Sequence, residues 1–155
     1  MAGKFETRIS ELGIVLPAAA APAANYVPAV ISGSLLYISG QLPFKDGKLA
    51  YLGRLGENVS VEDGYQAARL CGINLIAQIQ AAAGSLDRVR RIVRLGGFVS
   101  STADFTDQPK VVNGASDLFV EIFGEAGRHA RSAVGCPSLP RGVAVEVEAV
   151  VELAD

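Results

Sequence analysis

The chain has 155 residues, enough for one domain with its own core, and half of them are hydrophobic. Only 19% are charged, and 14 Lys and Arg against 16 Asp and Glu leave a net charge of −2. These numbers exclude a disordered chain and argue against a protein that binds nucleic acid mainly through its phosphates. We expect a single domain over residues 1–155, with residues 1–13 as an N-terminal helical extension.

The first part of the chain predicts a short helix, an extended arm and two strands. Residues 4–12 carry an apolar stripe and stop at Gly13, a pattern typical of a helix and its end. The segment 16–25 is rich in Ala and Pro and predicts an arm. The apolar runs 26–31 and 35–39 predict two short strands joined by a tight Ser-Gly-Ser turn.

Two longer helices are predicted further along. Ser60 and Asp63 have the spacing of a capping box, and apolar residues then recur every three or four positions as far as Gly84. The second helix is expected over 109–123, with a proline in its first turn and Gly124 as its stop.

The remaining apolar runs predict strands at 88–100, 130–134 and 143–153, and a further turn at 45–48. The resulting order is β, β, α, β, α, β, β. It predicts an α+β fold in which a mixed sheet of five to six strands has two helices on one face. The last strand reads as apolar on more than one face, so we expect another copy of the chain to cover the bare face in a closed homo-oligomer.

The C-terminal segment contains the most informative charged residues. If its two strands pair as a hairpin centred near Leu139, Arg131 lies opposite Glu146 and Glu148. The two glutamates share a strand face, so a guanidinium and a carboxylate would then line one patch. An ordinary surface ion pair is the alternative, although charges within an apolar strand favour a partner or a ligand.

Other residues allow a functional and a structural interpretation. Gly40 ends a strand, where it could admit a ligand close to the backbone or simply mark the transition to a loop. Four arginines fall within 88–94; they could bind phosphate, but ion pairs with acids or plain solvation are favoured. His129 could act as an acid or base but lacks a nucleophile in motif context, which favours a structural role.

Cysteine and targeting signals are few. Cys71 and Cys136 do not form a disulfide framework, so we expect reduced thiols in a cytoplasmic protein. Neither a signal peptide nor a membrane-spanning run is visible, and the acids and the single histidine show no metal-ligand spacing.

Several segments together resemble the Rid/YjgF family, the reactive intermediate deaminases also called endoribonuclease L-PSP. The resemblance covers roughly residues 14–153 and is most specific near the C-terminus. It rests on Tyr26, on Leu36-Tyr37-Ile38-Ser39-Gly40-Gln41-Leu42-Pro43, on Asn113, on Arg131-Ser132-Ala133-Val134, on Leu139-Pro140 and on Val145-Glu146-Val147-Glu148-Ala149.

The resemblance implies a chorismate-mutase-like fold and a homotrimer with ligand clefts between subunits. It also implies hydrolysis of reactive enamines and imines, such as 2-aminoacrylate, to 2-keto acids and ammonia, without a metal or other cofactor. Arg131 would hold the substrate carboxylate and Glu146 would activate water. The cleft would be lined by Tyr26, Gly40, Asn113 and Ala133, the last of which replaces a cysteine found in many members.

Two other functions stay open at this point. One is a trimer that binds small molecules such as 2-keto acids but has lost the reaction, which the change at Ala133 allows. The other is an RNA-cleaving or translation-inhibiting protein, which the acidic composition and the single histidine disfavour.

Overall fold

A computed structural model describes residues 1–22 and 24–155. The helices are α1 (Lys4–Glu11), α2 (Val61–Ala83) and α3 (Gln108–Phe123), with 3-10 turns η1 (Leu86–Arg88), η2 (Gly124–Gly127) and η3 (Pro140–Gly142). The strands are β1 (Ala29–Ser32), β2 (Leu35–Gln41), β3 (Phe44–Lys45), β4 (Lys48–Leu49), β5 (Val89–Ser100), β6 (Ala130–Cys136) and β7 (Val145–Leu153). Within the described ranges, no helix is long and apolar enough to cross a membrane.

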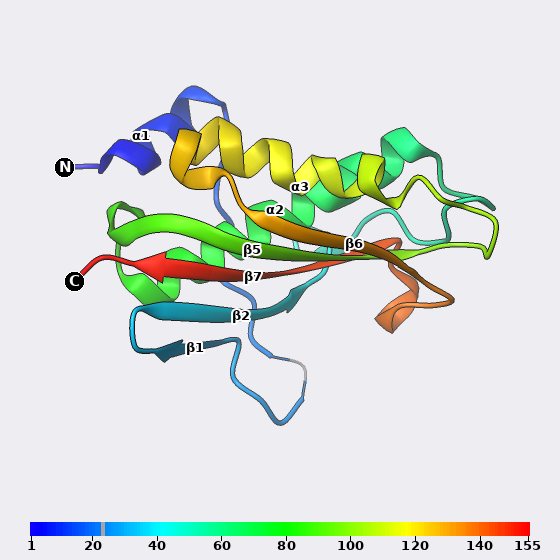
Figure 1. The fold of residues 1–155 in the computed structure, drawn as a ribbon, viewed down its shortest axis with the longest axis horizontal. Helices are drawn as coiled ribbons and strands as arrows, with labels where there is room; N and C mark the ends of the chain where they lie inside the picture. The colour runs from blue at the N-terminus through cyan, green and yellow to red at the C-terminus, as the bar shows by residue number, and fades with distance from the viewer. Residues whose placement is uncertain (23) are drawn as a thin grey trace.

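Five of the strands form one mixed sheet in the order β1-β2-β7-β5-β6. Only β5 and β6 are parallel; the other neighbours are antiparallel. Helices α2 and α3 pack against each other and against one face of the sheet (Figure 1). This arrangement confirms the predicted α+β fold, with five strands and both long helices on one side.

The central strand β7 alternates strictly between the two faces of the sheet. Its helix-facing positions are all buried: Val145, Val147, Ala149, Val151 and Leu153. Its other face carries three glutamates and one valine, all partly exposed: Glu146, Glu148, Val150 and Glu152. The expectation that this strand is apolar on both faces is therefore wrong, because the period of two separates its valines from its glutamates.

The predicted hairpin between the last two strands is also wrong, because β5 lies between β6 and β7. Strand β5, helix α3 and strand β6 form a strand-helix-strand unit, and the helical crossover makes its two strands parallel. Directly paired residues share a face: Arg131 pairs with Leu95, and Glu146 pairs with Phe98. Since Leu95 and Phe98 are three residues apart on one strand, Arg131 and Glu146 leave the sheet on opposite faces.

Most element ends agree with the sequence patterns. The Ser60 hydroxyl accepts a hydrogen bond of 3.1 Å from the backbone N–H of Asp63, which caps α2, and Gly84 ends that helix with a φ of 83°. The turn at 45–48 joins β3 to β4. Strand β1 starts at Ala29 rather than at residue 26, because Pro28 has no N–H with which to extend the ladder.

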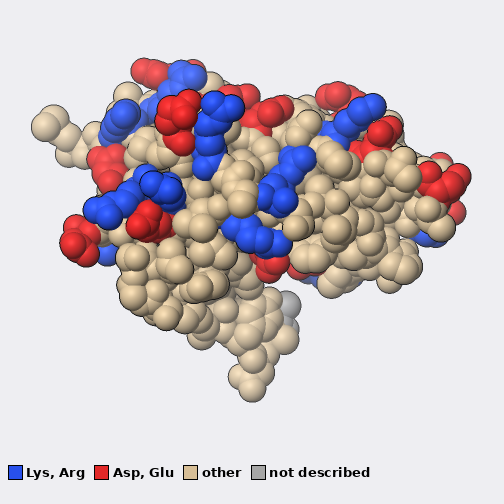
Figure 2. All heavy atoms as spheres, in the orientation of Figure 1, with Lys and Arg blue, Asp and Glu red and all other residues tan. Residues whose placement is uncertain are grey.

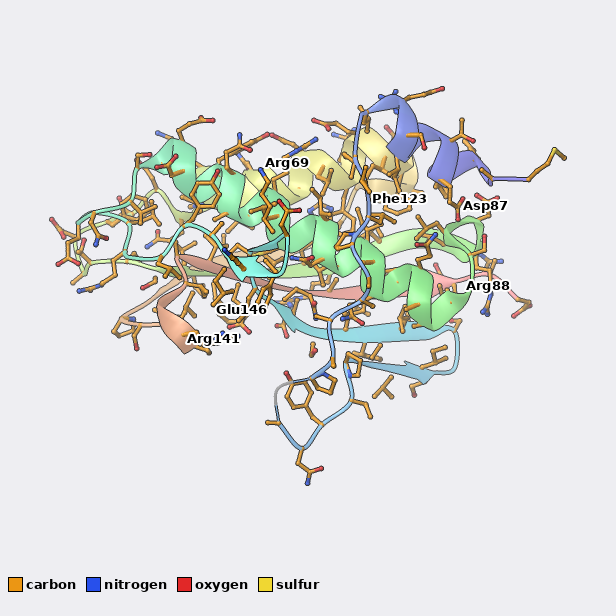
Figure 3. All side chains as sticks on the ribbon, turned by 180° about the vertical axis from the view of Figure 1, so that it is seen from behind. Arg69, Asp87, Arg88, Phe123, Arg141 and Glu146 are labelled. Carbon is orange, nitrogen blue, oxygen red and sulfur yellow. The ribbon has the colours of Figure 1, made fainter. Side chains whose placement is uncertain are left out.

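Helix α1 packs against the C-terminal end of α3. The rings of Phe5 and Phe123 meet edge to face with 4.8 Å between centroids, and Ile9 is buried in the same cluster. The Arg8 Nε donates a hydrogen bond of 3.0 Å to the backbone oxygen of Glu121. Figure 3 shows Phe123 and Asp87 beside this helix, at one end of the sheet.

Candidate functional site

The residues expected to form one site occur as two groups on opposite faces of the sheet. Glu146 of the central strand β7 and Gly40 lie together where β2 runs beyond the part that β1 covers, since β1 pairs only as far as Ile38. Arg131 lies on β6, a strand at the sheet edge. Strands β6 and β7 are two strand spacings apart, about 10 Å. One chain therefore holds two half-sites rather than a complete site.

The first half-site is built around the carboxylate of Glu146, and we call it the carboxylate half-site. Gly40 packs directly against this carboxylate, and a Cβ atom at position 40 would overlap it. Gly40 also lines a cavity of about 140 Å³ together with Tyr26 and Arg141. The side chains of Tyr26 and Arg141 are exposed, so this cavity is open on one side.

Burial raises the pKa of Glu146 above its usual value of 4.5, and the neighbouring charge of Glu148 raises it further. No hydrogen-bond donor among the described residues reaches the Glu146 carboxylate. A half-buried carboxyl group with a raised pKa holds a proton more readily than an exposed glutamate does, which suits a group that accepts and returns a proton.

Two buried amides of α2 hold the chain segments around this cavity. Asn74 Nδ2 donates to the backbone oxygens of Leu42 and Phe44 at 2.9 and 3.2 Å. One turn later, Gln78 Nε2 donates to the backbone oxygen of Ala20 at 2.8 Å, which ties the N-terminal arm to the helix. Sequence reasoning missed both residues, because they lie within an apolar helical pattern and contact segments far away in the chain.

The second half-site is built around Arg131, and we call it the arginine half-site. Arg131 Nη1 donates to Asn113 Oδ1 at 2.8 Å and to Ser116 Oγ at 3.1 Å. Asn113 and Ser116 are three residues apart on α3, so both project from the same helix face towards β6. The structure thus brings Arg131 and Asn113, two of the expected site residues, into direct contact, and Ser116 joins them.

His129 completes the arginine half-site. Its Nδ1 lies 2.6 Å from the backbone oxygen of Gly127, and its Nε2 lies 2.9 Å from Ser116 Oγ. Burial lowers the pKa of His129 below 6.5, and the charge of Arg131 lowers it further, against the opposing effect of the Gly127 carbonyl. The imidazole is therefore neutral at pH 7, and both of its nitrogens face partners within the chain.

Ala133 lies on the same strand face as Arg131 and pairs with Gly97. Its methyl group packs against the hydrophobic core and is partly exposed. Arg141 is a residue that sequence reasoning did not place in the site. It adopts a left-handed conformation with φ of 60°, and its guanidinium lies 5.6 Å from the ring centroid of Phe44. Figure 3 shows it near Glu146.

A family model described as "YjgF/chorismate mutase-like, putative endoribonuclease" matches residues 6–153. The chain belongs to this YjgF family. It is 53% identical to "Protein TCP17" of Trypanosoma cruzi over 97% of this chain and 95% of that protein.

Solved structures agree with this membership. The crystal structure of Atu1372 of Agrobacterium tumefaciens, a protein with unknown function, superposes with a TM-score of 0.91 at 50% identity, over 97% of this chain and 92% of that one. The crystal structure of E. coli TdcF with bound serine superposes with a TM-score of 0.64 at 27% identity, over 88% and 94% of the two chains.

Three of the four arginines within residues 88–94 of this YjgF chain form ion pairs with glutamates of the same chain. Arg90 and Arg91 pair with Glu152 at 3.9 and 3.4 Å, and Arg94 pairs with Glu148 at 3.8 Å. Figure 2 shows acidic and basic side chains interspersed on this face, with the region over β1 and β2 uncharged. The favoured interpretation, ion pairing with acids rather than a phosphate-binding patch, is confirmed for these three arginines.

Both cysteines are free thiols, as the sequence predicted. Cys71 is fully buried, and this burial raises the pKa of its thiol well above 9.0, which makes it a poor nucleophile. Among the described residues, no group of three His, Cys, Asp or Glu side chains is placed to hold a metal ion.

Proposed function

We propose that the protein is a hydrolytic deaminase of 2-imino acids and their enamine tautomers, active as a homotrimer. The observation that carries this proposal is the division of the candidate site: one face of the sheet carries Glu146, whose pKa is raised, and the other face carries the guanidinium of Arg131. Neither half-site is sufficient for the reaction by itself.

The two half-sites can meet between copies of the chain. A head-to-tail contact joins one surface of a subunit to a different surface of the next, and such contacts form a closed ring when the rotation closes. Apolar side chains on the helix-free face support such contacts, because Val30, Tyr37 and Val134 are each about half exposed. In a ring of three, each cleft would combine Arg131 of one subunit with Glu146 of its neighbour.

Arg131 would bind the substrate through its α-carboxylate. A planar guanidinium binds a carboxylate through two parallel hydrogen bonds, which fixes the orientation of the imine as well as its position. TdcF, whose structure contains bound serine, supports this step, because serine also presents an α-carboxylate next to a nitrogen-bearing carbon. The hydrogen bonds that Arg131 donates to Asn113 and Ser116 orient the guanidinium before the substrate arrives.

Glu146 would activate the attacking water. A protonated imine carbon is already electrophilic, so the remaining tasks are to place a water molecule and to move its proton. Glu146 accepts a proton as the water oxygen adds to the imine carbon, which gives a carbinolamine. Return of that proton to the nitrogen makes it a leaving group. The hydroxyl then gives its proton to Glu146 as the carbon–oxygen double bond forms and the carbon–nitrogen bond breaks, and this proton leaves with ammonia as ammonium, so the products are ammonium and a 2-keto acid.

The test is the release of ammonia and 2-keto acid from imino acids that an amino acid oxidase generates in the same vessel. The proposal expects faster release with the protein than without it, and a solution mass three times the 16.1 kDa of one chain. A monomeric mass, or a release rate that the protein does not change, would contradict it. Cleavage of RNA that Arg131→Ala abolishes would instead favour a nuclease.

A further inference from the structure

The arginine half-site contains hydrogen bonds that the proposed reaction does not by itself explain. Arg131 has five N–H donors: one on Nε and two on each terminal nitrogen. Both donors of Nη1 are directed to Asn113 and Ser116, and Nη2 lies 3.5 Å from the backbone oxygen of Pro109. Among the described residues, no acceptor lies within hydrogen-bonding reach of Nε.

Asn113 and Ser116 therefore leave free the Nε–H and the N–H groups of Nη2, whose contact of 3.5 Å with the Pro109 carbonyl is long for a hydrogen bond. The Nε–H and the Nη2–H that points in the same direction form the side edge of the guanidinium, which matches the two oxygens of a carboxylate. The contacts to Nη1 decide which edge stays free, because Nη1 is the terminal nitrogen on the opposite side from the Nε–H. Ser116 and Asn113 thus select the binding edge of Arg131.

The direction of each hydrogen bond around Ser116 follows from the chemistry of its partners. The carbonyl of Gly127 can only accept, so His129 Nδ1 carries the proton of this contact. In a neutral imidazole the other nitrogen must then accept, so the Ser116 hydroxyl donates to Nε2. Its hydrogen is committed to His129, and its oxygen lone pairs face Arg131 as an acceptor.

We infer that His129 and Ser116 act as positioning residues for Arg131, in a relay that runs from the Gly127 carbonyl through the imidazole and the hydroxyl to Nη1. The relay leaves the side edge of the guanidinium free for the carboxylate of a 2-keto or 2-imino acid, and in this respect it rests on the proposed function. Without His129, the Ser116 hydroxyl could rotate and turn its hydrogen towards Nη1. Phe119 packs edge-on against the imidazole, with 6.4 Å between the ring centroids, and keeps the ring in place.

A double-mutant cycle on ligand affinity tests this inference. Ser116→Ala should weaken binding of pyruvate about three- to tenfold, the range for loss of one hydrogen bond, while the melting temperature stays near that of the wild type. The same substitution in an Arg131→Ala background should change affinity less than about twofold, because its effect passes through Arg131. Equal losses in both backgrounds, or no loss in the wild type, would overturn the inference.

Asp117→Ala is the matched control, because Asp117 follows Ser116 on α3 and accepts a hydrogen bond of 2.7 Å from Tyr65 instead of Arg131. It should leave pyruvate affinity unchanged. If Ser116→Ala does not fold, His129→Phe keeps a ring against Phe119 and removes the acceptor, and it should weaken binding in the same direction.

Nitrogen NMR of the wild-type protein separates this inference from the proposed function. The relay requires His129 protonated at Nδ1 and unprotonated at Nε2, and it requires a rigid Arg131 Nε–H bond, with an order parameter near 0.85. These signals do not depend on catalysis, so they hold even if no keto acid binds. A proton on Nε2 of the neutral ring, or an order parameter below about 0.6, would overturn the relay.

Discussion

The two half-sites differ in how much of their geometry a single chain supplies. The side chain of Arg131 is held by α3 through Asn113 and Ser116, and behind Ser116 by His129. Glu146 has no such hydrogen bonds among the described residues; Gly40 gives it space, and burial gives it a raised pKa. The proposed function expects this difference, since a substrate anchor at Arg131 benefits from a fixed guanidinium and a proton-exchanging group at Glu146 benefits from freedom to move.

The largest expected effect comes from removing proton exchange at the carboxylate half-site. Glu146→Gln keeps the shape of the side chain but cannot accept a proton, so turnover should fall by about 10²–10⁴-fold. Pyruvate binding should change little. Steady-state release of 2-keto acid and calorimetric binding of pyruvate provide the two measurements.

Glu148→Gln is the control, because Glu148 shares the strand face of Glu146 but lies one pleat further along β7. At pH 8 it should retain most of the turnover. A large loss with Glu148→Gln and none with Glu146→Gln would show that the two roles are assigned to the wrong residues.

Removing the guanidinium of Arg131 should give a smaller effect, and it should act on ligand affinity as well as on turnover. Arg131→Ala should weaken pyruvate binding about 10- to 100-fold, the value of a charged hydrogen-bonding contact, and turnover should fall with it. Arg131→Lys keeps the charge but loses the two-pronged geometry, so it should also bind more weakly than the wild type. Unchanged affinity in both variants would remove Arg131 from the binding site.

The pH dependence of turnover sharpens the account of Glu146. As a base it must be unprotonated, and because its pKa is raised, turnover should fall on acidification already above pH 4.5. Glu148→Gln removes the neighbouring charge, which is the second cause of the raised pKa of Glu146. The loss of turnover on acidification should then begin at a lower pH, but still above 4.5, because burial continues to raise this pKa. Rate profiles from pH 4 to 8 would show the movement. In Glu152→Gln, further along the same strand face, the onset of this loss should stay where it is.

The smallest effect on the site is expected from the N-terminal helix. Deleting residues 1–12 removes the packing of Phe5 and Ile9 against the core and should lower the free energy of unfolding by about 2–4 kcal/mol. The contacts of α1 described above lie at the C-terminal end of α3, beyond Ser116, so pyruvate affinity should stay within a few-fold. Denaturant unfolding and calorimetry measure the two quantities, and a folded deletion variant that binds no ligand would place α1 in the site.

Local patterns were sufficient to predict the elements of this fold. The cap at Ser60, the stop at Gly84 and the periodicity between them depend on residues close in sequence, and the structure follows them. Strand pairing depends on contacts between distant segments, and here the prediction was wrong. The 14 residues between Arg131 and Glu146 suggested a hairpin, whereas β5 separates the two strands.

In the candidate site, too, contacts between segments distant in sequence could not be predicted. The resemblance to a family indicated Arg131, Asn113, Gly40 and Glu146, but it did not indicate the residues that support them. Ser116 lies on a helix face that is defined only when α3 docks beside β6, and its bond to His129 joins two elements. Asn74 and Gln78 are polar residues on a buried helix, and only the tertiary contacts show which carbonyls they satisfy.

The central claim is that Arg131 of one subunit and Glu146 of its neighbour act in one cleft. Complementation between inactive variants tests it most directly, because a subunit that lacks only Arg131 and a subunit that lacks only Glu146 can together form an intact cleft. Arg131→Ala and Glu146→Gln chains, co-expressed in equal amounts, should form mixed trimers in which about one quarter of the clefts combine an intact Arg131 with an intact Glu146. The account predicts that about one quarter of the wild-type turnover returns. Co-expression of Glu146→Gln with a chain that carries both substitutions should restore none. Mixed trimers no more active than either parent would show that the two half-sites do not act together across a subunit interface.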